Sequence, residues 1–129
     1  MKKKFFAAIA SVMMLGTILA MPVSAAETYQ KGDVNMDGKV DLADAQIVQL
    51  EYLHYFTGYE CTFNEEQMKL ATIVGHSTKH PKKTESIPFS VADAQVILQY
   101  YTYKDVLNTI DDSVTVEEFY AQIKEYTSK

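Results

Sequence analysis

The sequence predicts an all-α protein, and three observations support this prediction. A seven-residue motif occurs twice, because Leu42–Val48 (LADAQIV) returns 49 residues later as Val91–Ile97 (VADAQVI). Apolar residues in and after each copy follow the three- and four-residue spacing of a helix face. No stretch alternates polar and apolar residues over the length of a strand. We therefore expect two related loop–helix units with shorter helices around them.

The first 26 residues have the pattern of a secretion signal. Lys2–Lys4 give a positive start, Phe5–Met21 is apolar, and Val23–Ala25 is a small-residue cleavage site. An uncleaved membrane anchor is the alternative, because about 17 residues can just span a bilayer. We expect cleavage near Ala26, and hence a secreted, extracellular protein with no membrane segment afterwards.

The charge of the chain disfavours nucleic acid as a partner. The formal net charge is −5, from 12 lysines, no arginine and 17 acidic residues. Three lysines leave with the signal and all acids follow it, so nine lysines face 17 acids, or −8. Phosphates need basic side chains, whereas such an acidic chain suits a cation. Cys61 is the only cysteine, so it is either a buried thiol or paired between chains.

Residues 33–44 (DVNMDGKVDLAD) have the pattern of a calcium loop. Oxygen donors stand at loop positions one, three, five, nine and twelve, and Gly38 stands at position six. Calcium takes six to eight oxygen ligands, and the glycine allows the sharp bend. The twelfth position, usually Glu, is the shorter Asp44. The alternative is an Asx-rich turn that caps a helix without any metal.

Each repeat helix has two apolar stripes. One stripe of each is expected to face the other repeat, and comprises Ala45, Val48 and Tyr52 in the first helix and Ala94, Ile97 and Tyr101 in the second. The opposite stripe comprises Ala43, Ile47 and Leu50 in the first helix and Ala92, Val96 and Tyr103 in the second. Either the remaining helices or a partner protein covers this second stripe.

The segments around the repeats read as short helices and a loop. Gly58 is placed to end the first helix. Asn64 and Gln67 form a capping box for a linker helix, which we expect to continue through Ile73 and to close at Gly75. The polar stretch 76–88 reads as a loop. Thr115 begins another capping box, followed by an amphipathic helix.

An acidic loop of this form, followed at once by a helix and then duplicated, resembles a type I dockerin. The resemblance covers residues 30–103: repeat one 32–57, a linker helix and loop 58–88, and repeat two 89–103. Residues 104–129 form a C-terminal extension with a helix. The resemblance implies a pair of loop–helix (F-hand) calcium-binding repeats that dock onto a cohesin domain of a polysaccharide-degrading, cellulosome-type complex. The protein would be secreted, and held at a cell surface only through a cohesin.

The resemblance implies one calcium ion, bound in the first loop only. The implied ligands are the side chains of Asp33, Asn35, Asp37, Asp41 (directly or through water) and Asp44 (bidentate), with the backbone carbonyl of Lys39. Aligned at the same 49-residue offset, the second loop runs from Lys82 to Asp93, with Thr84, Ser86, Ile87 and Ser90 in place of Asn35, Asp37, Gly38 and Asp41. A lysine at the first ligand position repels calcium. His76 and His80 suggest zinc, but they have no clear third ligand.

The resemblance also implies which residues meet the partner. They lie just before the last loop ligand and on the outer face of each helix: Leu42, Ala43, Gln49, Leu50 and His54 in repeat one, and Val91, Ala92, Leu98, Gln99 and Tyr103 in repeat two. The near-symmetry of the copies would allow docking in two orientations.

We expect a binding module and not an enzyme. A glycoside hydrolase needs two carboxylates across a substrate cleft, and a small helical domain with its acids in a loop offers none. Two alternatives stay open: a secreted calcium-binding protein with a diverged, non-cohesin partner, or the remnant of a longer dockerin-bearing glycoside hydrolase.

Overall fold

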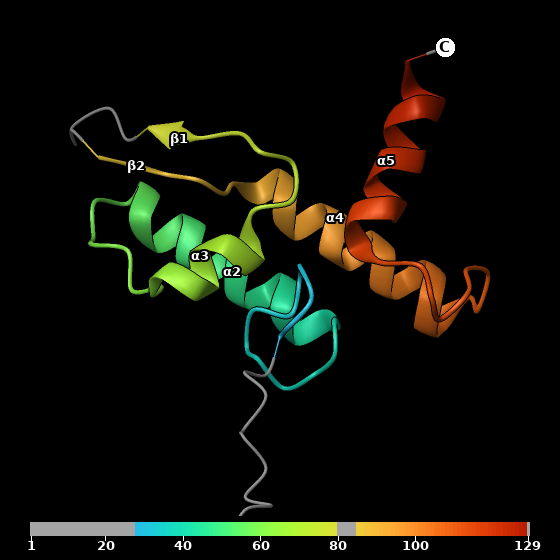
Figure 1. Ribbon diagram of the computed structural model, residues 1–129. Coiled ribbons are helices and arrows are strands. Elements are labelled where there is room, and N and C mark those ends of the chain that lie inside the picture. Colours follow the sequence, from blue (N-terminus) through green and yellow to red (C-terminus); the bar gives the residue numbers. More distant parts are fainter. Residues whose placement is uncertain (1–27, 80–84, 129) are drawn as a thin grey trace, which may run out of the picture.

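The computed structural model describes residues 28–79 and 85–128 (Figure 1), which form a mostly helical small domain. The elements in chain order are α2 (Leu42–Phe56), α3 (Glu65–Ala71), β1 (Thr78–Lys79), β2 (Ser86–Ile87), α4 (Val91–Tyr101), a π-helical turn (Thr102–Val106) and α5 (Val116–Thr127). The helical class that the sequence predicts is therefore confirmed. The expected signal peptide, residues 1–26, lies outside the described residues.

The region 76–88 contains a small β-hairpin, so the expectation of a purely helical domain was wrong there. β1 and β2 are antiparallel, with Thr78 opposite Ile87. Ile87 is 3 % exposed and anchors the hairpin in the core. Two-residue strands are too short to show an alternating pattern, which is why the sequence did not reveal them.

Each of the four α-helices within the described residues begins with a capping box. The two predicted boxes, Asn64–Gln67 before α3 and Thr115–Glu118 before α5, are confirmed; the other two are Asp41–Asp44 and Ser90–Asp93. In each box the side chain of the third helical residue accepts the N–H of the capping residue. The single acid of the repeated motif, Asp44 in the first copy and Asp93 in the second, therefore helps to start its helix in both copies.

The helix ends follow local chemistry. α2 stops before Gly58, whose positive φ of 106° suits glycine, as predicted. α3 ends at Ala71 and not at Ile73. The reason is that the N–H groups of Ile73 and Val74 donate to Asp93, which takes this backbone out of the helix.

The core forms where α2 packs against α4 (Figure 1). The predicted inner residues Ala45, Val48, Ala94 and Ile97 are buried. Tyr52 and Tyr101 are only half-buried, and Tyr55 and Tyr100 fill the core instead. Val96 was expected on the outer stripe and is buried, at 7 % exposure.

The C-terminal helix joins the first loop to the second repeat. In Figure 1, α5 packs on α4 at its start and then rises away from the rest of the domain. Val116 is fully buried beside Gly32. A methyl group on Gly32 would lie 3.1 Å from Val116 Cγ2 and 3.0 Å from Val40 Cγ1, so only glycine fits there without a shift.

Candidate metal loop and docking faces

Residues 33–44 form a tight loop that leads directly into α2. Two of its residues have left-handed backbone: Gly38 (φ 88°) and Met36 (φ 60°). The bend at Gly38 lies at the position where a calcium loop needs one. The second bend, at Met36, was not predicted, and it is unusual for a residue with a side chain.

Asp33 lies at the base of this loop and is 1 % exposed. Its Oδ1 accepts the N–H of Asp37 at 3.1 Å, and its Oδ2 accepts the N–H of Gly38 at 3.0 Å. Asn35 and Asp37 are exposed, and the Asn35 amide donates to Asp37 Oδ2 at 3.0 Å. Asp33 therefore folds the loop back over itself through backbone donors.

Asp44 ties the start of the loop to the start of α2, and it is fully buried. Its Oδ1 accepts the N–H groups of Val34 (2.8 Å) and Asn35 (3.0 Å), and its Oδ2 accepts that of Asp41 (2.9 Å). A carboxylate offers about four lone-pair positions, so about one remains on Asp44 and two on Asp33. Asp44 is thus placed to bind an ion through one oxygen, whereas the resemblance implies two.

The buried carboxylates carry poorly compensated charge. Burial raises the pKa of Asp33 and the pKa of Asp44 above the usual value for Asp, and backbone donors offset this only in part. The charge of Asp33 adds to the rise in the pKa of Asp44. Within residues 28–79 and 85–128, neither group forms an ion pair with a basic side chain. Backbone N–H groups are therefore their main compensation.

The acids of the loop do not gather into a single cluster. In the described part of the chain, no group of three or more His, Cys, Asp or Glu could hold a metal ion. Asp37 Oδ1 accepts the N–H of Lys39 (2.9 Å), and Asp41 Oδ1 accepts that of Ala43 (2.8 Å). A coordination shell would need the Asp37 and Asp41 side chains to turn toward Asp33 and Asp44.

The second loop is longer than the constant offset predicts. Asp93 Oδ1 accepts the N–H groups of Ile73 (2.7 Å) and Val74 (2.8 Å), as Asp44 does from Val34 and Asn35. The separation is 20 and 19 residues for Asp93, against 10 and 9 for Asp44. The start of the second loop is therefore near Thr72 and not Lys82, and the hairpin occupies the extra length.

In this register, the second loop has no acidic residue at its first ligand position and no oxygen-bearing side chain at its third. Thr72 corresponds to Asp33 and Val74 to Asn35, so neither place carries a carboxylate. Lys82 and Thr84, which the constant offset places at ligand positions, lie outside the described residues, as does His80 of the zinc alternative.

The outer face of α2 is apolar and uncovered in the described structure. Its exposed side chains are Leu42, Ala43, Gln46, Gln49, Leu50, Leu53 and Phe56. Leu50 is 65 % exposed and Phe56 50 %. Leu53 and Phe56 were not predicted to lie on this outer face, although they follow Leu50 at three-residue steps, which place them on the same side of the helix. None of the exposed side chains is charged, so this face suits an uncharged partner surface.

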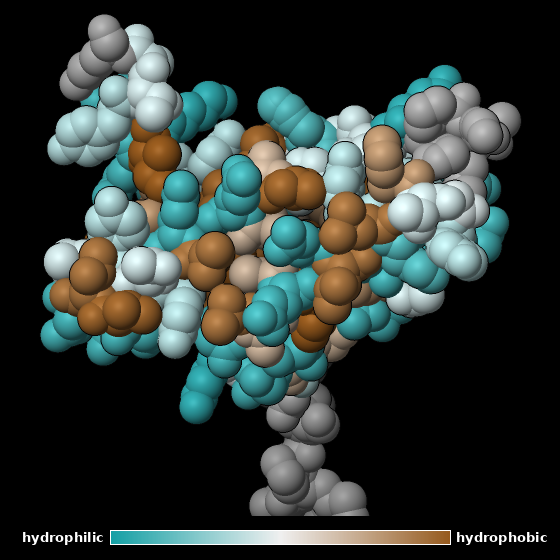
Figure 2. Space-filling view, turned by 180° about the vertical axis from the view of Figure 1, so that it is seen from behind, coloured by the Kyte–Doolittle hydropathy of each residue, from teal (hydrophilic) through white to brown (hydrophobic). Residues whose placement is uncertain are grey.

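The remaining partner-binding candidates also reach the surface. Ala92, Leu98, Gln99 and Tyr103 are exposed on α4 and the turn after it, and Val91 is half-buried. Seen from behind, the molecule shows separate hydrophobic areas set among hydrophilic side chains (Figure 2).

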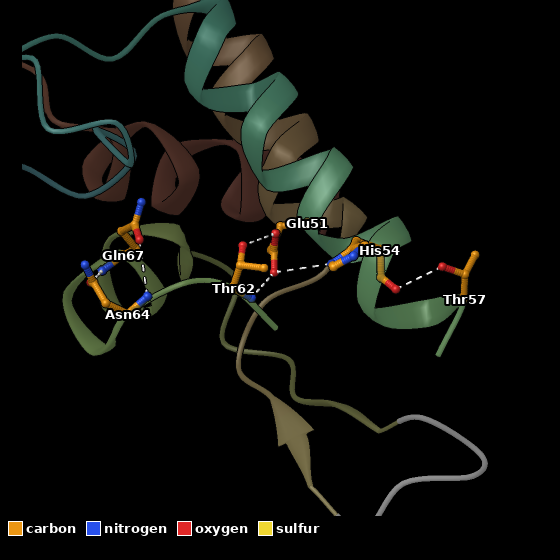
Figure 3. A network of polar contacts seen from close by, with 6 residues as sticks. All are labelled: Glu51, His54, Thr57, Thr62, Asn64 and Gln67. Atoms are coloured by element: carbon orange, nitrogen blue, oxygen red, sulfur yellow. Dashed lines mark hydrogen bonds and ion pairs between the residues drawn. The ribbon is translucent and has the colours of Figure 1, made fainter. Parts of the chain in front are cut away.

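The last turns of α2 are fixed to the linker by a polar network (Figure 3). Glu51 is 8 % exposed and accepts both the hydroxyl (2.8 Å) and the N–H of Thr62. His54 lies near it, with Nδ1 4.0 Å from Glu51 Oε1, and its ring stacks on Tyr59 with centroids 4.7 Å apart. His54, expected to meet the partner, is thus held at one flank of the outer face.

Comparisons with protein-family models and with curated proteins find no match for this chain. No helix within the described residues is long and apolar enough to cross a membrane. The dockerin resemblance therefore depends on the loop motif and the internal repeat.

Proposed function

We propose that this chain is a secreted, calcium-dependent docking module of the dockerin type, which binds a cohesin domain of a polysaccharide-degrading complex. The observation that carries the proposal is the buried pair Asp33 and Asp44, which lies in an Asp/Asn-rich loop and has no basic partner among the described residues. Taking two carboxylates out of water is costly unless a cation or hydrogen bonds compensate. A hard divalent cation with oxygen ligands supplies the missing charge.

By residue type and spacing, the donor set suits one calcium ion. Its ligands would be Asp33, Asn35, Asp37, Asp41 and Asp44 through side chains, and Lys39 through its carbonyl. The ion would supply positive charge at the base of α2 and fix the loop that sets the direction of this helix. Binding at a hundred to a thousand times the dissociation constant adds about 3 to 4 kcal/mol to stability.

The partner would meet the outer face of a repeat helix, and α2 offers an apolar one. Leu42, Leu50, Leu53 and Phe56 give α2 an uncharged apolar surface of the kind that marks an interface. No catalytic role is proposed, because the buried acids Asp33 and Asp44 are held by backbone donors and not across a substrate cleft.

A binding assay with matched variants tests this proposal. Purified secreted protein would be passed over immobilised type I cohesin domains, with calcium or with EDTA. We expect binding in calcium and loss of binding in EDTA. Asp44→Asn should lose binding even in calcium, whereas Asp93→Asn should be less stable but keep calcium-dependent binding. Binding that is indifferent to EDTA would remove calcium from the account. Calcium binding without any cohesin binding would favour a diverged partner.

A further inference from the structure

The two repeats share a motif, yet their outer faces have different surroundings. Leu50 of α2 and Gln99 of α4 are counterparts at the 49-residue offset. Around Leu50 the exposed side chains of α2 form an open surface. A partner that recognised only the shared motif could reach either helix, so the neighbouring elements would decide which helix it binds.

The neighbour of α4 is the C-terminal helix. Phe119 of α5 packs against Tyr100, with ring centroids 5.8 Å apart, and against Tyr103 at 5.7 Å. Gln99 and Tyr103 form one wall of a groove of about 420 Å³, and α5 forms the other wall with Phe119, Gln122, Ile123 and Tyr126. Two of the five partner-binding candidates of repeat two therefore face α5.

The direction of α5 makes this neighbour an obstacle. The helix leaves α4 and rises away from the domain as far as the C-terminal end (Figure 1). Its outer residue Tyr126 is 83 % exposed and projects beside the groove. A small molecule can enter a groove of this size, whereas a globular protein laid along α4 would meet α5 first.

We infer that α5 closes the outer face of α4 to a globular partner, so that the partner docks through α2 in a single orientation. This inference rests on the proposed docking function. The occupant of the α2 face is a protein with an uncharged, apolar contact surface, because no exposed side chain of α2 is charged although the chain as a whole carries −5. The two repeats are similar in sequence, but α5, which lies outside both of them, makes their outer faces different.

The closure itself is testable without any partner. Leu50→Cys and Gln99→Cys would be made in a Cys61→Ser background and labelled with a small maleimide, and then with a maleimide carried on a globular protein. We expect similar rates with the small reagent, and a several-fold slower rate at Gln99→Cys with the protein-borne reagent. Equal rates with the protein-borne reagent would overturn the inference.

The docking orientation is tested by the matched charges Leu50→Glu and Gln99→Glu. Both positions are exposed, and the melting curve of each variant checks its folding. With an immobilised type I cohesin domain as probe, Leu50→Glu should weaken binding by about 100-fold, as for a central interface residue, while Gln99→Glu leaves it almost unchanged. Equal effects, or an effect of Gln99→Glu alone, would overturn the single orientation. Failure of the unaltered protein to bind would remove the cohesin proposal, and the labelling rates would still decide whether α5 closes α4.

Discussion

In both repeats a carboxylate in the first turn of the helix holds the start of the preceding loop. Asp44 does so across 10 residues and Asp93 across 20. The first loop buries a second carboxylate, Asp33, and also contributes Val34 and Val40 to the core. The second loop has a hairpin and Phe89, which is fully buried with its ring 5.1 Å from that of Phe63.

This difference shows two ways to close one loop. The first loop concentrates negative charge, and the described side chains supply no counter-charge, so we expect it to depend on a bound cation. The second loop has a short sheet and the buried ring of Phe89, and we expect it to close without an ion. We therefore expect calcium to control the first half of the domain and packing to control the second.

The largest effect should follow from Phe89→Ala. Removing this ring leaves a cavity in the second loop and should cost about 3 to 5 kcal/mol in the free energy of unfolding, with or without calcium. The matched variant is Val40→Ala, since each residue precedes the capping residue of its helix; it should cost about 2 kcal/mol and also reduce the stabilisation by calcium. Urea unfolding followed by circular dichroism measures both. A calcium-dependent cost for Phe89→Ala would contradict the division between the loops.

Removal of calcium should destabilise the protein nearly as much as Phe89→Ala does, but its effect should be confined to the first repeat. We expect EDTA to lower stability by about 3 to 4 kcal/mol relative to saturating calcium. Hydrogen exchange should show faster exchange in α2, while the inner amides of α4 keep their protection. Equal loss of protection in α2 and α4 would show that the domain responds as one unit.

Gly32→Ala tests the contact between the first loop and α5. Its positive φ of 93° and the close approach of Val40 and Val116 predict a loss of about 2 to 3 kcal/mol. Gly58→Ala is the matched control, because Gly58 has a φ of 106° with open space around it, and should cost about 1 kcal/mol. Thermal melts give both values. Similar costs would mean that α5 is not packed against the loop.

The smallest effect concerns the cap of α5. Hydrogen bonds from Thr115 lower the pKa of Glu118. A lowered pKa stabilises the folded protein above the unfolded pKa, and this contribution disappears as the pH falls through the folded pKa. Glu118→Gln should therefore lower the melting temperature slightly at neutral pH. The melting temperature of this variant should also decrease less than that of the unaltered protein when the pH is lowered toward about pH 3. The stabilisation by calcium near neutral pH should stay unchanged in this variant.

The helices were predictable because their signals are local. Capping boxes at Asn64 and Thr115, Gly58, and the buried stripes of α2 and α4 follow from residues three or four apart. The register of the second loop was not predictable from the sequence, because it depends on which backbone N–H groups bind Asp93 across some 20 residues. The covering of α4 by α5 is likewise a long-range contact. The metal-ligand positions remain a prediction from spacing.

Calorimetric titration of the purified secreted chain with calcium is the most direct test of the difference between the loops. We expect one ion per unaltered chain, one ion for Asp93→Asn, and no ion for Asp44→Asn. An absence of binding in the unaltered chain, or a second ion that disappears in Asp93→Asn, would contradict it.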